Sequence, residues 1–236
     1  MTTDFVDLRT QLALDFSRDP GATLASFVAL GNEQLVAQIA GLEVLPRTSF
    51  YLSGPPESGK SHLLQAACEV VSHHGDTAAY LPLGQLIDSS ARCLDGLEAL
   101  GLVALDGLEI IAGNPEWEEA VFHCFNRLRD RGGALLVAAT GAPEALGIQL
   151  PDLVSRLQGL LRYRLPPPDD ARRRAILTHQ AKMRGLELPT ASADYLLRHE
   201  ARALRHLIEM LDRLDAASLE QARRLTVPFI RKVLGR

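Results

Sequence analysis

Eight consecutive residues with the pattern G-x-x-x-x-G-K-[ST] could bind a polyphosphate. They are Gly54, Pro55, Pro56, Glu57, Ser58, Gly59, Lys60 and Ser61. The two glycines let the backbone turn tightly, so that main-chain N–H groups can approach an anion. Lys60 can reach the outer phosphates, and the Ser61 hydroxyl can ligate Mg²⁺. Unless it is a chance glycine-rich turn, the pattern predicts a nucleotide site with magnesium.

The residues around this loop predict the strand and the helix that must position it. Residues 48–52 form a short apolar run typical of a buried strand, and residues 61–68 have the pattern of a helix. A helix that begins at the loop directs the positive end of its dipole at the anion. We therefore expect His62, in the first turn of that helix, to belong to the nucleotide-binding residues.

Strands and helices alternate along the chain from about residue 24 to residue 165. The later predicted strands are 77–81, 102–106, 134–140 and 162–165. Helices are expected at 32–40 and 116–131. This alternation predicts a parallel sheet covered by helices on both faces.

After three consecutive prolines at 166–168, the pattern is helical. Asp169 or Asp170 can cap the first of these helices, and Gly185 can end it. The sequence thus predicts an α/β fold, with a three-layer phosphate-loop base around a parallel sheet and a small C-terminal all-helical lid. We expect three parts: a tail at 1–24, a nucleotide-binding base at 25–165 and a lid at 166–236.

Asp106 ends an apolar strand, where a carboxylate commonly holds the magnesium of a bound nucleotide. A helix cap or a turn aspartate is the alternative. The next residue is Gly107, which cannot orient an attacking water as a second acid would. Glu109 follows at a position that does not obviously serve this purpose. We therefore expect weak or no intrinsic ATP hydrolysis.

Composition restricts the function further. The net charge is −4 and the pI is about 6.0, which argues against a surface that grips nucleic acid everywhere. The three cysteines form no C-x-x-C pair and no zinc spacing, as is typical of inert thiols in a reducing cytoplasm. No run is long and apolar enough for a signal peptide or a membrane span, so we expect a cytoplasmic protein.

With these motifs the chain resembles the AAA+ family and, within it, the relatives of the bacterial replication initiator DnaA. Residues 27–32, which end in Asn32, are similar to the segment that lies against adenine and ribose. Residues 54–61 resemble the Walker A motif and residues 102–106 resemble Walker B. Thr140 resembles the sensor 1 residue that reads the terminal phosphate.

The same resemblance implies roles for two arginines. Residues 150–157 resemble the segment that carries an arginine finger, which places the finger at Arg156. Residues 203–207 resemble the sensor 2 segment, which implies that Arg205 or its neighbour Arg202 reaches the nucleotide. Arg172, Arg173 and Arg174 are expected to be solvated surface charges.

A short segment of the tail fits the motif by which bacterial proteins dock on the DNA polymerase sliding clamp. Its anchors are Gln11, Leu12, Leu14 and Phe16. Gln11 would bind in a small polar pocket while the apolar side chains fill a cleft, a common mode of peptide recognition. An amphipathic edge strand or a stray tail would show a similar pattern.

The resemblance implies a regulatory protein that binds ADP or ATP with Mg²⁺, docks on the sliding clamp and stimulates hydrolysis of the ATP bound to DnaA. No helix-turn-helix segment follows the lid, so contact with DNA is expected only through the clamp. A homo-oligomer is possible, and no membrane partner is expected. The alternatives are an autonomous AAA+ ATPase of the helicase-loader type and a non-catalytic adaptor stabilised by nucleotide.

Overall fold

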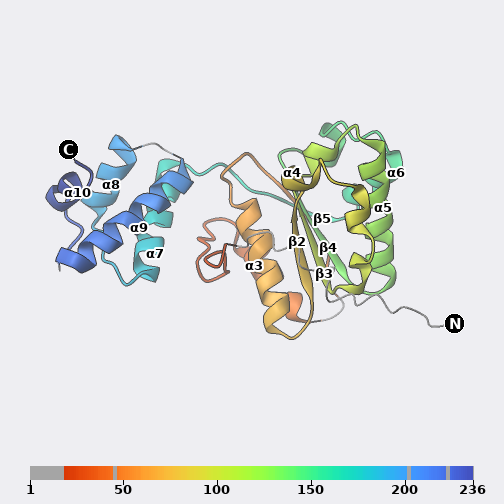
Figure 1. The fold of residues 1–236 in the computed structure, drawn as a ribbon, viewed down its shortest axis with the longest axis horizontal. Helices are drawn as coiled ribbons and strands as arrows, with labels where there is room; N and C mark the ends of the chain where they lie inside the picture. The colour runs from red at the N-terminus through yellow and green to blue at the C-terminus, as the bar shows by residue number, and fades with distance from the viewer. Residues whose placement is uncertain (1–18, 45–46, 201–202, 222–223, 236) are drawn as a thin grey trace.

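A computed structural model describes residues 19–44, 47–200, 203–221 and 224–235, and shows two lobes (Figure 1). One lobe holds the sheet with its covering helices, and the other is helical. Arg202 and the tail anchors Gln11, Leu12, Leu14 and Phe16 lie outside the described residues, so their roles stay predictions.

All neighbouring strands of the sheet are parallel. The strands are β1 (Phe50–Ser53), β2 (Ala78–Pro82), β3 (Leu102–Asp106), β4 (Ala134–Ala139) and β5 (Leu161–Arg164). Their order is β2-β3-β4-β1-β5. Ser53 pairs with Ala139 and Asp106 pairs with Ala138, so the carboxyl ends of three central strands lie at one edge. The predicted parallel sheet is confirmed.

Helices cover both faces of this sheet. On one face lie α2 (Glu33–Ala40) and α3 (Lys60–His73). On the other lie α4 (Leu83–Leu86), α5 (Pro115–Asp130) and α6 (Pro151–Gln158). Alternation along β3 serves the two faces, because Leu102 and Ala104 join one apolar cluster while Val103 and Leu105 join the other. β4 is buried throughout, as its apolar run predicts.

The second lobe contains four helices among the described residues. They are α7 (Asp170–Met183), α8 (Thr190–His199), α9 (Leu204–Gln221) and α10 (Val227–Val233). Asp169 caps α7, since its carboxylate accepts the Arg172 N–H at 2.7 Å, and Gly185 follows the helix with φ of +74°. Leu177, Leu196 and Leu211 belong to an apolar core separate from the two cores of the sheet. The all-helical lid is confirmed.

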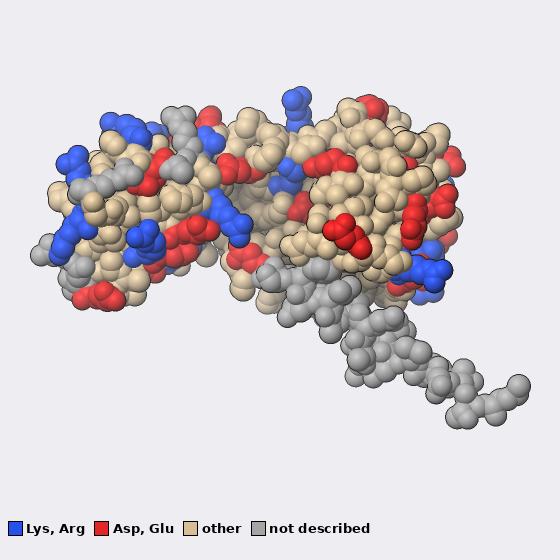
Figure 2. Space-filling view, turned by 45° about the horizontal axis from the view of Figure 1, so that its top comes forward, with Lys and Arg blue, Asp and Glu red and all other residues tan. Residues whose placement is uncertain are grey.

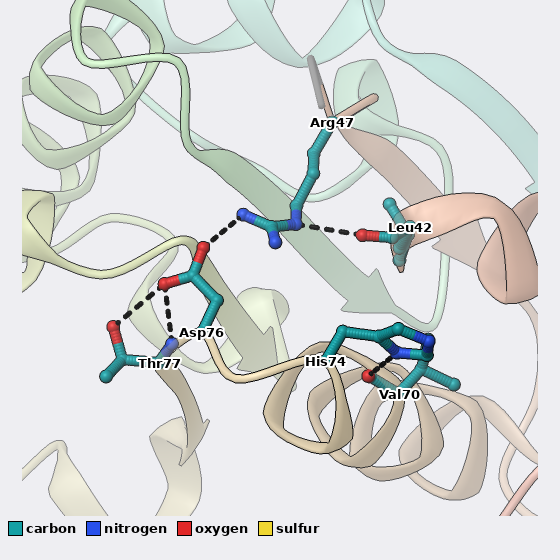
Figure 3. Close-up of polar contacts among 6 residues, drawn as sticks. All are labelled: Leu42, Arg47, Val70, His74, Asp76 and Thr77. Carbon is teal, nitrogen blue, oxygen red and sulfur yellow. Dashed lines mark hydrogen bonds and ion pairs between the residues drawn. The ribbon is translucent and has the colours of Figure 1, made fainter. Parts of the chain in front are cut away.

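The amino edge of the sheet is held by a partly buried ion pair (Figure 3). Arg47 precedes β1 and is only 4% exposed; its Nη1 lies 2.6 Å from Asp76 Oδ2, and its Nε donates to the Leu42 carbonyl at 2.9 Å. The Thr77 N–H donates to Asp76 Oδ1 at 2.6 Å, and these bonds hold the pKa of Asp76 below its usual range. A Cβ on Gly101 would lie within 2.5 Å of Asp76 Oδ2 and Arg47 Nη1, so a larger residue there would displace the side chains of the pair.

Candidate nucleotide-binding site

The phosphate loop between β1 and α3 is a cradle that side chains would fill. A Cβ on Gly54 would lie 2.5 Å from the Leu165 carbonyl oxygen and 2.8 Å from Ser58 Oγ. Gly59 has φ of +95°, and a Cβ there would lie 2.8 Å from the Phe27 ring. Both glycines of the pattern are therefore required by close approach, and the exposed backbone fits an anion.

Lys60 sits at the mouth of this loop. Its Nζ donates to the carbonyls of Gly54 at 2.6 Å and Pro55 at 2.8 Å, and it forms no ion pair with a described carboxylate. Burial lowers the pKa of Lys60, while the charges of Asp106 and Glu109 partly oppose that change. The ammonium group is thus held by uncharged carbonyl oxygens. A bound phosphate could replace these carbonyls as its hydrogen-bond partner.

Asp106 and Thr140 end neighbouring strands at the same edge as the loop. Asp106 Oδ2 accepts a hydrogen bond from the Tyr80 hydroxyl at 2.7 Å. Among the described residues, no group of three His, Cys, Asp or Glu side chains could hold a metal by itself. One aspartate and the exposed Ser61 hydroxyl suit Mg²⁺, which usually takes its other ligands from phosphate and water.

Glu109 belongs to this edge, which sequence reasoning did not expect. Gly107 adopts φ of +83° and turns the chain into the short 3₁₀ helix η4 (Leu108–Ile111). The turn brings Glu109 Oε2 to within 3.2 Å of the Thr140 backbone nitrogen, which donates to it. An acid three positions after Asp106, across a glycine, is the sequence signal that could have located it.

An apolar pocket lies beside the phosphate loop, between the base and the lid. Phe27, Val28 and the buried Asn32 line it from the base. The lid contributes apolar side chains from two helices: Ile176, Leu204 and Ile208. An apolar slot next to a phosphate cradle could take a purine base, and three residues of the segment 27–32 are among those that line it.

His62 supports the base wall of this pocket. Its Nε2 lies 2.8 Å from the Thr23 carbonyl oxygen, and its ring centroid lies 5.4 Å from that of Phe27. Burial lowers the pKa of His62, which favours the neutral ring. In this form the Nε2 hydrogen can be donated to Thr23, so His62 holds the segment before α2 against the loop.

The lid helix α7 is bonded to that same segment by three side chains. The Arg172 guanidinium donates to the Leu30 carbonyl. His179 Nε2 lies 2.7 Å from the Ala25 carbonyl oxygen, and Gln180 donates to the Ser26 carbonyl at 3.2 Å. The lid therefore closes on the wall that lines the pocket.

The expectation that residues 172–174 are solvated charges is wrong. Arg172 is bonded to the base, and Arg174 Nε lies 2.5 Å from Asp194 Oδ1. Arg173 is mostly buried and lies 3.9 Å from the Glu57 carboxylate. These arginines occupy the first turns of α7, where long side chains reach across to the base, which a row of like charges does not reveal in the sequence.

Glu57 joins the phosphate loop to the lid. Its Oε1 accepts the Leu204 N–H at the start of α9 at 3.1 Å, and its backbone has φ of +62°. A carboxylate at a helix N-terminus also interacts favourably with the positive end of the helix dipole. Glu57 therefore contacts both α9, through the Leu204 N–H, and α7, through Arg173.

The two arginines assigned by resemblance lie on exposed helix faces. Arg156 is in the last turn of α6, is exposed, and forms no ion pair with a described carboxylate. Arg205 has a side chain 91% exposed and pairs with Glu209 at 3.4 Å. Leu204 and Ile208 line the pocket from α9, whereas Arg205 is not among its lining residues.

Comparison with known proteins supports this reading of the fold. Residues 170–234 match the family described as Hda, lid domain. Domain III of the replication initiation protein DnaA from Thermotoga maritima superposes with a TM-score of 0.72 at 22% identity, over 92% of this chain and 97% of that one. DnaA from Aquifex aeolicus, bound to AMPPCP, superposes with a TM-score of 0.69 at 24% identity, over 86% of this chain and 68% of that one. The RuvB Holliday junction branch migration motor of Thermotoga maritima superposes with a TM-score of 0.61 at 18% identity, over 86% of this chain and 67% of that one.

The parallel sheet and the helical lid thus share the fold of domain III of DnaA. The match to the Hda lid domain covers residues 170–234. Over these residues the chain is similar to Hda, and over the whole fold it is similar to domain III of DnaA. Two of the DnaA structures that this fold resembles hold the nucleotide analogue AMPPCP.

Proposed function

We propose that this protein binds ADP with Mg²⁺ between base and lid, docks on the sliding clamp and stimulates hydrolysis of ATP on DnaA. The base comprises residues 25–165 and the lid residues 166–236. The observation that carries the proposal is the pairing of a glycine-dependent phosphate cradle with a lid of the Hda family. Conversion of the initiator to its ADP form would prevent a second round of initiation.

Each group of the site has a role in nucleotide binding under this proposal. Backbone amides of the loop and Lys60 bind the phosphates, and Ser61 and Asp106 hold Mg²⁺, which neutralises phosphate charge when bound. Asn32 and the apolar pocket hold the base and sugar. Thr140 reports on the phosphates, and Arg205 would do so after leaving Glu209 and turning toward the loop. Glu57 passes the occupancy of the loop to the lid through Leu204 and Arg173.

Arg156 is proposed to act outside its own site. Its exposed position on α6 leaves it able to enter a neighbouring molecule's active site. A guanidinium keeps its charge and can bind two phosphate oxygens at once, so it can stabilise the charge that develops in phosphoryl transfer. The neighbour would be DnaA with ATP bound.

Docking would use residues 11–16, which precede the segment held between α3 and α7. On the face shown in Figure 2, acidic and basic side chains of the described residues are interspersed on both lobes, without one large basic patch. This distribution favours contact with DNA through the clamp instead of direct binding. No described helix has the length and apolarity of a membrane span, and we place the protein in the cytoplasm.

Reconstitution with purified components tests the proposal. ATP-bound DnaA, DNA-loaded clamp and this protein together should give rapid ATP turnover, whereas this protein alone should turn over ATP very slowly. Gln11→Ala should abolish the stimulation, while Gln34→Ala, an exposed glutamine on α2, should preserve it. Stimulation that survives without the clamp would contradict the docking step.

A second candidate, an autonomous ATPase, is favoured by one observation. Glu109 places a carboxylate beside Thr140 and close enough to Lys60 to affect its pKa. Fast turnover by the isolated protein that is lost in Glu109→Gln would establish this candidate over the regulatory one. Stimulation of DnaA that survives in Arg156→Ala but is lost in Gln11→Ala would instead indicate a non-catalytic adaptor.

A further inference from the structure

Tyr80 is a hydroxyl-bearing side chain at the proposed magnesium position that no motif includes. It lies on β2, in register with Ala104 of β3, and its side chain reaches the carboxylate of Asp106 further along that strand. The hydroxyl donates to Asp106 Oδ2 at 2.7 Å, a short bond to a charged acceptor. The hydrogen bond therefore fixes one oxygen of the carboxylate assigned to Mg²⁺.

Two side chains of α3 also lie near the Tyr80 hydroxyl. The Ser61 and Gln65 side chains on α3 lie close enough to lower the pKa of Tyr80, although burial and Asp106 raise it overall. Ser61 is the other proposed magnesium ligand. The Tyr80 ring packs against the apolar cluster beneath α3, so the position of its hydroxyl is set by the core.

We propose that Tyr80 positions Asp106 for Mg²⁺, as an outer partner that orients the carboxylate without ligating the metal itself. A carboxylate has several lone pairs, so one oxygen can accept from Tyr80 while the group still binds the metal or its water. Partners of this kind hold metal ligands in place, and their loss typically weakens metal binding by 10- to 100-fold. The inference rests on the proposed nucleotide site.

The test is the magnesium dependence of ADP binding by the full chain, measured by calorimetry in Mg²⁺ and in EDTA. Tyr80→Phe removes only the hydroxyl. We expect the gain in ADP affinity that Mg²⁺ confers to fall about tenfold, with affinity in EDTA unchanged. Tyr163→Phe is the matched control, because Tyr163 packs against the same apolar cluster from β5 and should leave both affinities unchanged.

A double-mutant cycle shows whether Tyr80 acts through the aspartate. In an Asp106→Asn background, Tyr80→Phe should have little further effect on the magnesium dependence. Unchanged magnesium dependence in Tyr80→Phe, or an equal loss of affinity in EDTA, would overturn the proposal while leaving the nucleotide site intact. Absence of ADP binding by the wild-type chain would overturn the proposed function as well.

Discussion

The two edges of the parallel sheet use charged residues in opposite ways. At the amino edge, Arg47 and Asp76 bind each other at 2.6 Å and are further bonded to backbone groups. At the carboxyl edge, Lys60 is held by backbone carbonyls and Asp106 by a tyrosine hydroxyl. Charges at the first edge neutralise one another, whereas those at the second are positioned by neutral partners.

This difference separates residues that hold the fold from residues that bind a ligand. In the Arg47–Asp76 pair the aspartate is 36% exposed, so loss of the buried arginine leaves a partly solvated carboxylate without its charged partner. A cation held by neutral carbonyls can still gain much more from a phosphate. The comparison therefore predicts that substitutions at the two edges change different measured quantities.

Among these substitutions, Lys60→Ala should have the largest effect. It should weaken ADP binding and change stability little. The loss of the charge that meets the phosphates should weaken ADP binding by about 100-fold, as expected for a charge-assisted contact. The free energy of unfolding should change by less than about 1 kcal/mol, because removal of a partly buried cation offsets its lost hydrogen bonds. Calorimetry and urea unfolding measure the two quantities, with the exposed Lys182→Ala as control.

Arg47→Met should show the reverse pattern. The methionine preserves much of the apolar stem but leaves Asp76 without its guanidinium partner, which should reduce the free energy of unfolding by about 2 kcal/mol. ADP affinity of the folded protein should be unchanged. Arg162→Met, at an exposed pair 3.7 Å from Glu144, should alter stability little. A large loss of ADP affinity in Arg47→Met would contradict the separation of the two edges.

Substitution of His62 should have the smallest effect. It should appear in the pH dependence of the free energy of unfolding. The pKa of His62 is lowered in the folded protein, so the unfolded chain takes up a proton first as the pH falls. Stability should therefore decline from about pH 6.5, the usual pKa of histidine, down to the lowered pKa of the folded state. Urea unfolding of His62→Gln without nucleotide should show a weaker decline over this range. Parallel curves for both proteins would show that His62 makes no such contribution.

Much of the fold and the central part of the site could be predicted from sequence because they depend on local patterns. The continuous apolar run of β4 predicts a strand buried on both faces, and Asp169 and Gly185 mark the ends of α7. The glycines of the phosphate loop are predicted by the spacing of the motif itself, although the groups that crowd them, Leu165 and Phe27, are distant in the sequence. Such signals need no knowledge of distant neighbours.

Contacts between distant segments could not be predicted in this way. Glu109 reaches Thr140 only because the sheet places β3 and β4 side by side, and Tyr80 reaches Asp106 for the same reason across β2 and β3. Arg173 approaches Glu57 only after the lid has folded over the loop. Helix α6 is not among the helices that the sequence pattern predicts.

ATP turnover by DnaA in the presence of clamp, DNA and Arg156→Ala tests the central claim most directly. The variant should fold, bind ADP and bind the clamp as the wild type does, because Arg156 is exposed and lies outside the pocket. The account predicts that stimulated turnover is lost in this variant and retained in Arg162→Ala. Full stimulation by Arg156→Ala would contradict the claim that this arginine completes the active site of DnaA.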